Sequence, residues 1–165
     1  MGVGEAAWTQ NADFLVFGIL LLLFAIGFRR VMRDAVGQRP ATVGGLLIAA
    51  TGLGVVGSGV FPAAPATEAL HFLAGFLLAF ASAIATTFYI GRKLRGVRGW
   101  ERSARYSQLT GAGAVALVAF SFVALNPASP LEEAGLGGLI ERLLVIEVFA
   151  WHVVMARRLM RESGD

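Results

Sequence analysis

Cysteine is absent from this chain of 165 residues, so disulfide bonds, thiolate metal sites and cysteine nucleophiles are excluded. Charged residues are scarce too: they make up 15% of the sequence, against roughly 25% in an average soluble domain. A water-soluble globule built from this chain would lack the polar side chains needed to cover its surface. The hydrophobic fraction of 56% and the mean hydropathy of +0.70 instead indicate a membrane protein.

Five apolar stretches hold most of the hydrophobic residues, and the charges lie mainly between them. They predict an all-α integral membrane protein with a single domain over residues 1–165, folded as a compact bundle of five transmembrane helices. The first stretch has no Lys or Arg before it and no small-residue cleavage motif after it, so we interpret it as a retained span and not as a signal peptide. The predicted spans cover residues 14–31, 41–61, 69–90, 109–125 and 136–156.

Positive charge is missing from the amino-terminal segment and from the connectors after the second and fourth spans. Except for Arg142, every Lys and Arg lies at the end of the first, third or fifth span or directly after it. This distribution predicts that the amino terminus is outside and the carboxy terminus is cytoplasmic, in the inner (plasma) membrane of the cell. Because the basic clusters set topology, the sequence pI of about 10.2 does not indicate nucleic-acid binding.

The second span is rich in glycine, which in water would argue against a helix. In a bilayer the backbone must satisfy its own hydrogen bonds, so a helix is expected, and the glycines let a neighbouring helix approach closely. In the third span Gly75, Ala79 and Ala83 form a ridge of small residues that is predicted to pack against the second span. The hydroxyl residues of the third span are expected to bond back to the helix backbone: Ser82, Thr86 and Thr87.

Short motifs are spread over most of the chain: WTQNADF at residues 8–14, Gly59-Val60-Phe61-Pro62, Leu70-His71, Trp100 with Tyr106-Ser107, and Gly138-Leu139 with Arg142-Leu143. Together they resemble a family of prokaryotic multi-pass membrane proteins catalogued as domain of unknown function 998. The resemblance implies the fold and topology described above. It supplies no function.

The sequence departs from that family pattern in two places. Family members usually carry an additional helix before the tryptophan-containing segment, and this chain is expected to lack it. Their Phe-Pro turn is usually followed by an acidic residue, whereas Ala63-Ala64-Pro65 follows it here. If that carboxylate has a role, this protein has lost it or has replaced it with Glu68.

The last span differs from the others because it carries several ionisable side chains, which are costly in a membrane and usually face protein or water. In the predicted orientation Glu141 and Arg142 lie in its outer quarter, Glu147 lies near the midplane, and His152 lies in the inner part. At about 100° per residue these side chains point in several directions. We therefore expect this span at the centre of the bundle.

A carboxyl group at the depth of Glu147 is expected to be neutral, paired with a cation or hydrated. No acid-base partner occurs at a similar depth in the first, second or fourth span. Glu147 is therefore predicted either to form a structural hydrogen bond with a hydroxyl group such as that of Ser121, Ser82 or Thr86, or to face a cavity as a proton or cation site.

Arg142 is expected to pair with Glu68, Glu132 or Glu133, or to reach a lipid phosphate at the outer interface. The functional alternative is an outer polar pocket that is formed by the outer end of the third span and the outer end of the fifth span. With the midplane carboxyl included, the candidate intramembrane polar site consists of Glu147, Glu141, Arg142, His71 and Glu68.

The histidines His71 and His152 are possible cofactor ligands, each for a separate pigment or haem. They lie at opposite ends of their spans, roughly 20 Å apart at 1.5 Å per residue, which is too far for one shared iron. We predict no cofactor and no metal site as the default. The basic connector after the third span supplies candidate contacts for anionic lipid headgroups: Arg92, Lys93, Arg95 and Trp100.

These features favour a non-enzymatic protein that acts as an accessory or scaffold subunit of a larger membrane complex, because the loops are short and no catalytic set is recognisable. The first alternative is a small transporter or a proton- or lipid-handling protein that uses Glu147 and the outer polar cluster. The second alternative is a pigment- or haem-binding membrane protein. The expected partners are membrane lipids and either other membrane subunits or a second copy of the chain.

Overall fold

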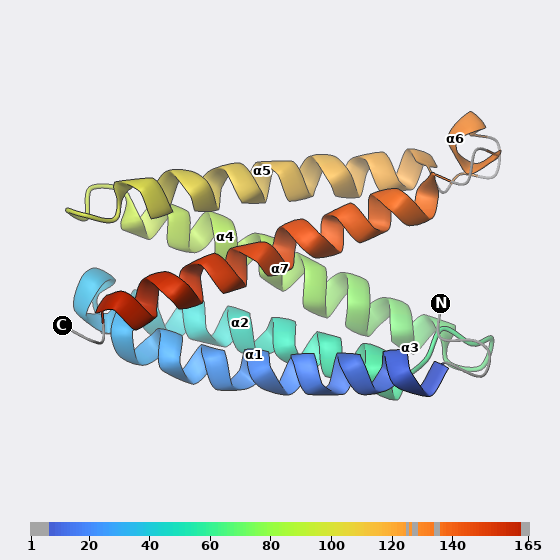
Figure 1. Ribbon diagram of the computed structural model, residues 1–165, viewed down its shortest axis with the longest axis horizontal. Helices are drawn as coiled ribbons and strands as arrows, with labels where there is room; N and C mark the ends of the chain where they lie inside the picture. Colours follow the sequence, from blue (N-terminus) through green and yellow to red (C-terminus); the bar gives the residue numbers. More distant parts are fainter. Residues whose placement is uncertain (1–6, 125, 127–128, 134–135, 163–165) are drawn as a thin grey trace.

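The computed structural model describes residues 7–124, 126, 129–133 and 136–162, and in this part of the chain the all-α prediction is confirmed. In Figure 1, α1, α2 and α5 run along the longest axis of the molecule, whereas α7 and the segment that contains α4 cross the bundle obliquely. The three elements α3, η1 and α4 follow one another without a break and form one continuous helical segment, in which η1 is a π-helix. The elements are α1 (Ala7–Val36), α2 (Gln38–Val60), α3 (Glu68–Phe72), η1 (Leu73–Phe80), α4 (Ala81–Leu94), α5 (Glu101–Ala124), α6 (Pro130–Glu133) and α7 (Gly137–Glu162).

Four helical segments are long and apolar enough to cross a membrane: Trp8–Val36, Gln38–Val60, Glu68–Leu94 and Glu101–Ala124. Their outer faces carry many exposed Leu, Ile, Val and Phe side chains, as a surface in contact with lipid requires. The protein is therefore a multi-pass membrane protein. The helices extend beyond the predicted spans, and the 30 residues of α1 reach about 45 Å, more than the ~30 Å of a hydrocarbon core.

Glycines bring α1 and α2 into backbone contact, as the composition of the second span predicts. A methyl group added at Gly18 would lie 2.7 Å from the carbonyl oxygen of Gly52, and one added at Gly52 would lie 2.9 Å from the carbonyl oxygen of Gly18. Gly59 approaches the carbonyl oxygen of Asn11 in the same way, at 2.8 Å. Gly37 joins the two helices with φ 88°, a left-handed conformation that glycine adopts without steric cost.

The ridge of small residues in the third span packs only in part as predicted. Gly54 of α2 lies directly against η1, because an added methyl group would stand 2.6 Å from the carbonyl oxygen of Ala74 and 2.8 Å from the Cα of Ala79. Gly75 faces the hydroxyl of Ser58. Ala83, beyond the π-helical stretch, belongs instead to a cluster with residues of α5 and α7. A π-helix has more residues per turn than an α-helix, so the facing direction changes along this segment.

One end of the bundle has a tightly packed core. It gathers the carboxy-terminal halves of α1, α4 and α7 and the amino-terminal parts of α2 and α5. Trp151 of α7 is fully buried there, and its indole N–H donates to the hydroxyl of Ser107 on α5 at 2.8 Å. Its largest other members are Phe28, Met32, Ile48, Ile90, Leu94, Trp100, Met155 and Leu159.

Trp100 is buried in this core, so the proposal that its ring contacts lipid headgroups is wrong. The turn before α5 contains Gly96 and Gly99, both with positive φ, and it folds the indole ring inward. The guanidinium group of Arg158 lies 4.9 Å from the ring centroid and donates to the carbonyl oxygen of Gly99 at 3.2 Å. This cation–π contact ties α7 to the turn.

The expected central position of the last span is also wrong. α2 is the inner helix: half of its most apolar window is buried, compared with 22% to 28% in the other three candidate spans. α7 packs mainly on α5 and α1 and leaves Leu139, Ile146 and Val153 exposed. The ionisable side chains of α7 lie in different surroundings along the helix. Other helices therefore need not enclose α7 on all sides.

Candidate functional site

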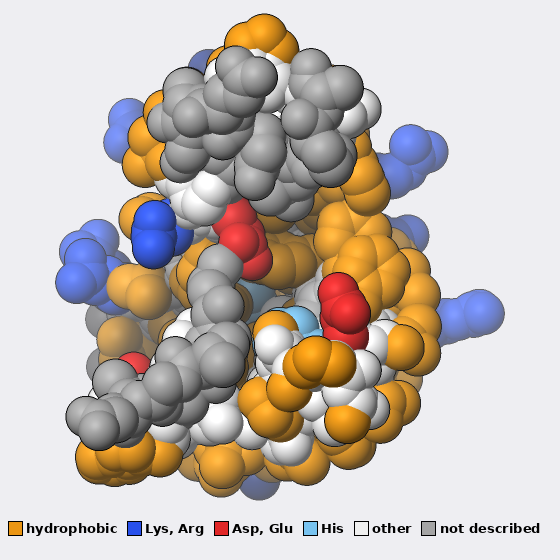
Figure 2. Space-filling view, turned by 90° about the vertical axis from the view of Figure 1, so that its right-hand side faces the viewer, with side chains coloured by type: hydrophobic (Ala, Val, Ile, Leu, Met, Phe, Trp, Pro, Cys, Tyr) orange, Lys and Arg blue, Asp and Glu red, His pale blue; other side chains and the backbone are white. Residues whose placement is uncertain are grey.

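The end of the bundle opposite the packed core is hollow. A cavity of about 610 Å³ lies between α1, α2, η1, α5 and α7. Figure 2 shows this end, with acidic and histidine side chains around a depression whose walls are hydrophobic. The lining includes, among others, Gln10, Asn11, Phe14, Thr51, Ser58, His71, Phe72, Phe76, Phe80, Ser121, Glu141, Arg142 and Phe149.

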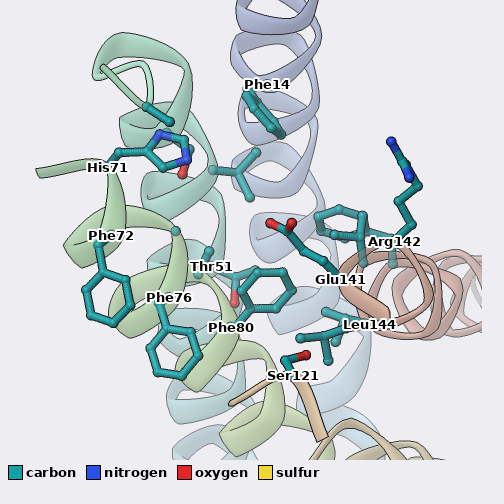
Figure 3. Close-up of a pocket in the computed structure, with 18 of the residues that line it drawn as sticks. Phe14, Thr51, His71, Phe72, Phe76, Phe80, Ser121, Glu141, Arg142 and Leu144 are labelled. Atoms are coloured by element: carbon teal, nitrogen blue, oxygen red, sulfur yellow. The ribbon is translucent and has the colours of Figure 1, made fainter. Parts of the chain in front are cut away.

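Glu141 is the acidic residue among the described residues that line this cavity. It lies four residues into α7, about 6 Å from the start of the helix at 1.5 Å per residue. Its carboxylate points into the cavity, toward the side on which Phe14 and His71 lie (Figure 3). The side chain is partly buried, and among the described residues no cation forms an ion pair with it.

Arg142 belongs to the lining residues, but its guanidinium group extends away from Glu141 and from the middle of the cavity (Figure 3). It donates to the carbonyl oxygen of Gly138, one turn earlier in α7, at 3.4 Å. Within the described residues it forms no ion pair with Glu68, which is exposed and does not line the cavity. The side chains of the other predicted partners, Glu132 and Glu133, lie outside the described residues.

His71 lines the cavity from α3, and its orientation is fixed by the preceding connector. Its Nδ1 lies 2.7 Å from the carbonyl oxygen of Phe61, at the end of α2. A carbonyl oxygen only accepts, so Nδ1 carries the proton and donates it. In the neutral ring Nε2 is then an acceptor.

The aromatic wall of the cavity was not predicted. Phe72, Phe76 and Phe80 all line it, with Phe72 and Phe76 stacked at 5.0 Å between ring centroids. From the other side come Phe14 of α1 and Phe149 of α7. In the sequence, Phe72, Phe76 and Phe80 follow one another at a spacing of four residues, which indicates a shared helix face. Such a face is equally compatible with lipid contact, so the spacing alone does not predict a cavity wall.

Glu147 lies outside the cavity lining and faces α5. Its carboxyl group lies directly over Gly113, where an added methyl group would come within 3.0 Å of Cδ. Glu147 Oε2 is buried without a hydrogen-bond partner. The hydroxyls of Ser121 and Thr86, predicted as its partners, donate to the carbonyl oxygens of Leu117 and Ser82 in their own helices. Glycine at position 113 thus makes space for a carboxyl group, and within the described residues no hydroxyl satisfies its buried Oε2.

Replacing Glu147 by methionine is expected to raise the thermal midpoint of unfolding in detergent. An unsatisfied buried polar atom costs about 1–3 kcal/mol, and the unbranched thioether fills the same space over Gly113 without that cost. Circular dichroism during heating measures the shift, with Glu147→Gln as the control that keeps a polar head. A lower midpoint for the methionine variant would show that the carboxyl group is a structural hydrogen-bonding partner after all.

His152 is buried among rings and does not line the cavity. Its Nδ1 lies 3.0 Å from the carbonyl oxygen of Val148, while its Nε2 is buried without a partner. Phe24 and Trp151 lie edge-on to it, at 6.0 and 5.1 Å between centroids. His152 therefore belongs to the packing between α7 and α1 and is separate from the cavity that His71 lines.

The remaining candidate residues lie at the packed end. Arg92, Lys93 and Arg95 are exposed, and Lys93 approaches the ring of Tyr89 at 5.5 Å from its centroid. Searched over the described residues, the chain holds no group of three or more His, Cys, Asp or Glu side chains placed to bind a metal ion. Of the predicted outer cluster, the cavity thus gathers His71, Glu141 and Arg142.

Comparison with protein families gives one match. The family described as "Protein of unknown function (DUF998)" matches residues 1–158, nearly the whole chain. Searches of curated proteins and of solved structures give no match. The resemblance carried by the short motifs is therefore confirmed.

Proposed function

Because this chain belongs to the DUF998 family, which carries no assigned function, we propose a function from its cavity: the protein binds a small amphipathic molecule within the membrane. The single observation that carries the proposal is the cavity of about 610 Å³ at the hollow end of the bundle. Its volume lies within the range of about 300–1,000 Å³ that is usual for small-molecule sites.

The distribution of polar groups in the cavity supports an amphipathic ligand. Phe76, Phe80 and Phe149 offer an apolar surface for a hydrocarbon chain. Glu141 and His71 offer a few polar atoms that fix a head group. A large apolar wall with few converging polar groups is the usual composition of a ligand site. This favours lipid handling, the first alternative, while the accessory-subunit function stays a prediction.

The orientation of the protein follows the distribution of its basic residues. We infer that α7 is a fifth span, because it runs along the bundle beside α1 and α5 and ends in Arg157, Arg158 and Arg161 (Figure 1). The amino terminus then lies outside and the carboxy terminus in the cytoplasm of a plasma membrane. In this orientation the hollow end faces the outer leaflet, from which an amphipathic molecule would enter.

The proposal is tested by binding of monodecanoyl glycerol, a neutral amphiphile with one short chain, to the protein in lipid nanodiscs. Equilibrium dialysis against empty nanodiscs of the same lipid corrects for partitioning. Wild-type protein is expected to bind about one equivalent above the empty discs. Ser121→Phe, which adds a ring to the cavity wall, is expected to weaken binding by about tenfold or more.

Val123→Phe is the matched control, because Val123 lies on the same helix but is exposed and does not line the cavity. This variant should bind like the wild type. Equal binding to empty and protein-containing discs, or unchanged binding by Ser121→Phe, would overturn the proposal.

A further inference from the structure

We propose that the cavity selects a cationic amphiphile, whose ammonium group lies beside Glu141 and whose chain lies among the phenylalanine rings. This inference rests on the proposed function and names the chemical class of its ligand. It starts from the charge of Glu141, whose carboxylate points into the cavity and has no ion-pair partner among the described residues. A carboxylate in apolar surroundings gains most from a cation that enters with the ligand.

The positive side chains nearest to the cavity do not take that role. Arg142 directs its guanidinium group away from the cavity and toward the carbonyl oxygen of Gly138 (Figure 3). Glu68, the acidic residue at the start of α3, does not line the cavity. Among the described residues, Glu141 therefore supplies the carboxylate that lines the cavity.

His71 agrees with a cationic ligand and not with an anionic one. Its one ring proton, in the neutral form, is used by Phe61, because Nδ1 donates to that carbonyl oxygen at 2.7 Å. The other ring nitrogen is then an acceptor, which can receive an N–H from an amine head group. Between His71 and Glu141 an anionic head group would meet an acceptor nitrogen and a carboxylate, and both would repel it.

The aromatic wall adds a second attraction of the same sign. Phe14 and Phe80 lie on either side of the carboxylate in the close-up view (Figure 3). The face of an aromatic ring is electron-rich and attracts ammonium groups within about 6 Å. The same rings pack against a hydrocarbon chain, so one wall serves both parts of the ligand.

Depth in the membrane fits this arrangement. Glu141 lies close to the amino-terminal end of α7, while Thr51, Val148 and Phe149 line deeper parts of the cavity. A head group at Glu141 would thus remain near the interface, and the chain would extend toward the middle of the bilayer. This is the orientation that an amphiphile already has in a lipid leaflet.

The test uses three ligands that share a ten-carbon chain and differ in charge: decyltrimethylammonium, monodecanoyl glycerol and decanoate. Binding to the protein in zwitterionic nanodiscs is measured at pH 7 with empty discs as the reference. Decyltrimethylammonium is expected to bind about tenfold more tightly than decanoate. Decylamine, which can also donate to His71, is expected to bind at least as tightly as the quaternary ion.

Glu141→Gln is expected to remove most of this preference, so that the affinities for decyltrimethylammonium and decanoate differ by about twofold or less. Glu147→Gln is the matched control, because it removes a carboxylate from the same helix outside the cavity, and its preference should equal that of the wild type. Tighter binding of decanoate, or a cation preference that Glu141→Gln leaves intact, would overturn the inference. If only the preference is missing, the amphiphile site stands without charge selection; if none of the ligands binds, the proposed function itself fails.

Discussion

Replacing Trp151 by alanine is expected to lower the free energy of unfolding by about 3–5 kcal/mol, the largest loss from any single truncation in this protein. The indole is fully buried in the packed end and contacts side chains from several helices. Its N–H donates to Ser107 at 2.8 Å and joins α7 to α5. Removal leaves a large void that the tightly packed neighbours cannot close. Thermal unfolding followed by circular dichroism in detergent measures the loss.

Two controls separate packing from the loss of a tryptophan. Trp8→Ala makes the same chemical change at a side chain that is 72% exposed, and its midpoint should not change. Trp151→Phe keeps most of the packing and should cost roughly 1–2 kcal/mol, because Ser107 still donates to the carbonyl oxygen of Ser103. Similar midpoints for Trp8→Ala and Trp151→Ala would show that the core at this end does not hold α7 in place.

Replacing Gly54 by alanine is expected to cost about 2–3 kcal/mol, although only one methyl group is added. The new methyl would lie 2.6 Å from the carbonyl oxygen of Ala74 and 2.8 Å from the Cα of Ala79. These are backbone atoms and cannot rotate aside, so α2 and η1 must separate. The same thermal measurement reports the result, and a midpoint lower by roughly 5–10 °C is expected for a chain of this size.

The matched control is Gly27→Ala, because an added methyl group at Gly27 has nothing within 4 Å. Alanine favours helices over glycine by about 1 kcal/mol, so this variant should be as stable as the wild type or more stable. Gly113→Ala gives an intermediate case, since the three atoms nearest to the added methyl group belong to the flexible end of Glu147. Equal stability of Gly54→Ala and Gly27→Ala would contradict the close packing of α2 on η1.

Much of the fold could be predicted from the sequence because a bilayer leaves the backbone few options. Apolar length predicts the helices, and the glycines of the second span predict its close approach to a neighbour. The position of α7 could not be predicted in this way. Each ionisable side chain of α7 was expected to require a neighbouring helix on its side. In the structure Glu147 instead lies over one glycine, Gly113, and Arg142 extends outward. Such local solutions depend on the atoms opposite, which a helical wheel does not contain.

The candidate site was predicted only through its charged residues. Sequence and depth placed His71, Glu141 and Arg142 near each other, and all of them line the cavity. The cavity itself results from how five helical segments diverge at one end, which no single segment encodes. The burial of Trp100 was missed for a similar reason. Its position beside basic residues indicated an interface, but Arg158 from the other end of the chain covers its ring.

The π-helical stretch η1 bears on how relatives of this chain should be aligned. A π-helix accommodates about one residue more than an α-helix with the same number of turns. A relative that lacks one residue between Leu73 and Phe80 could therefore wind this stretch as an ordinary α-helix and keep similar faces before and after it. A single-residue gap there preserves the helix, whereas the same gap elsewhere in the segment would rotate all later side chains by about 100°. For such relatives, an alignment that forbids gaps within membrane helices can match either His71, before this stretch, or Thr86 and Thr87, after it, but not both.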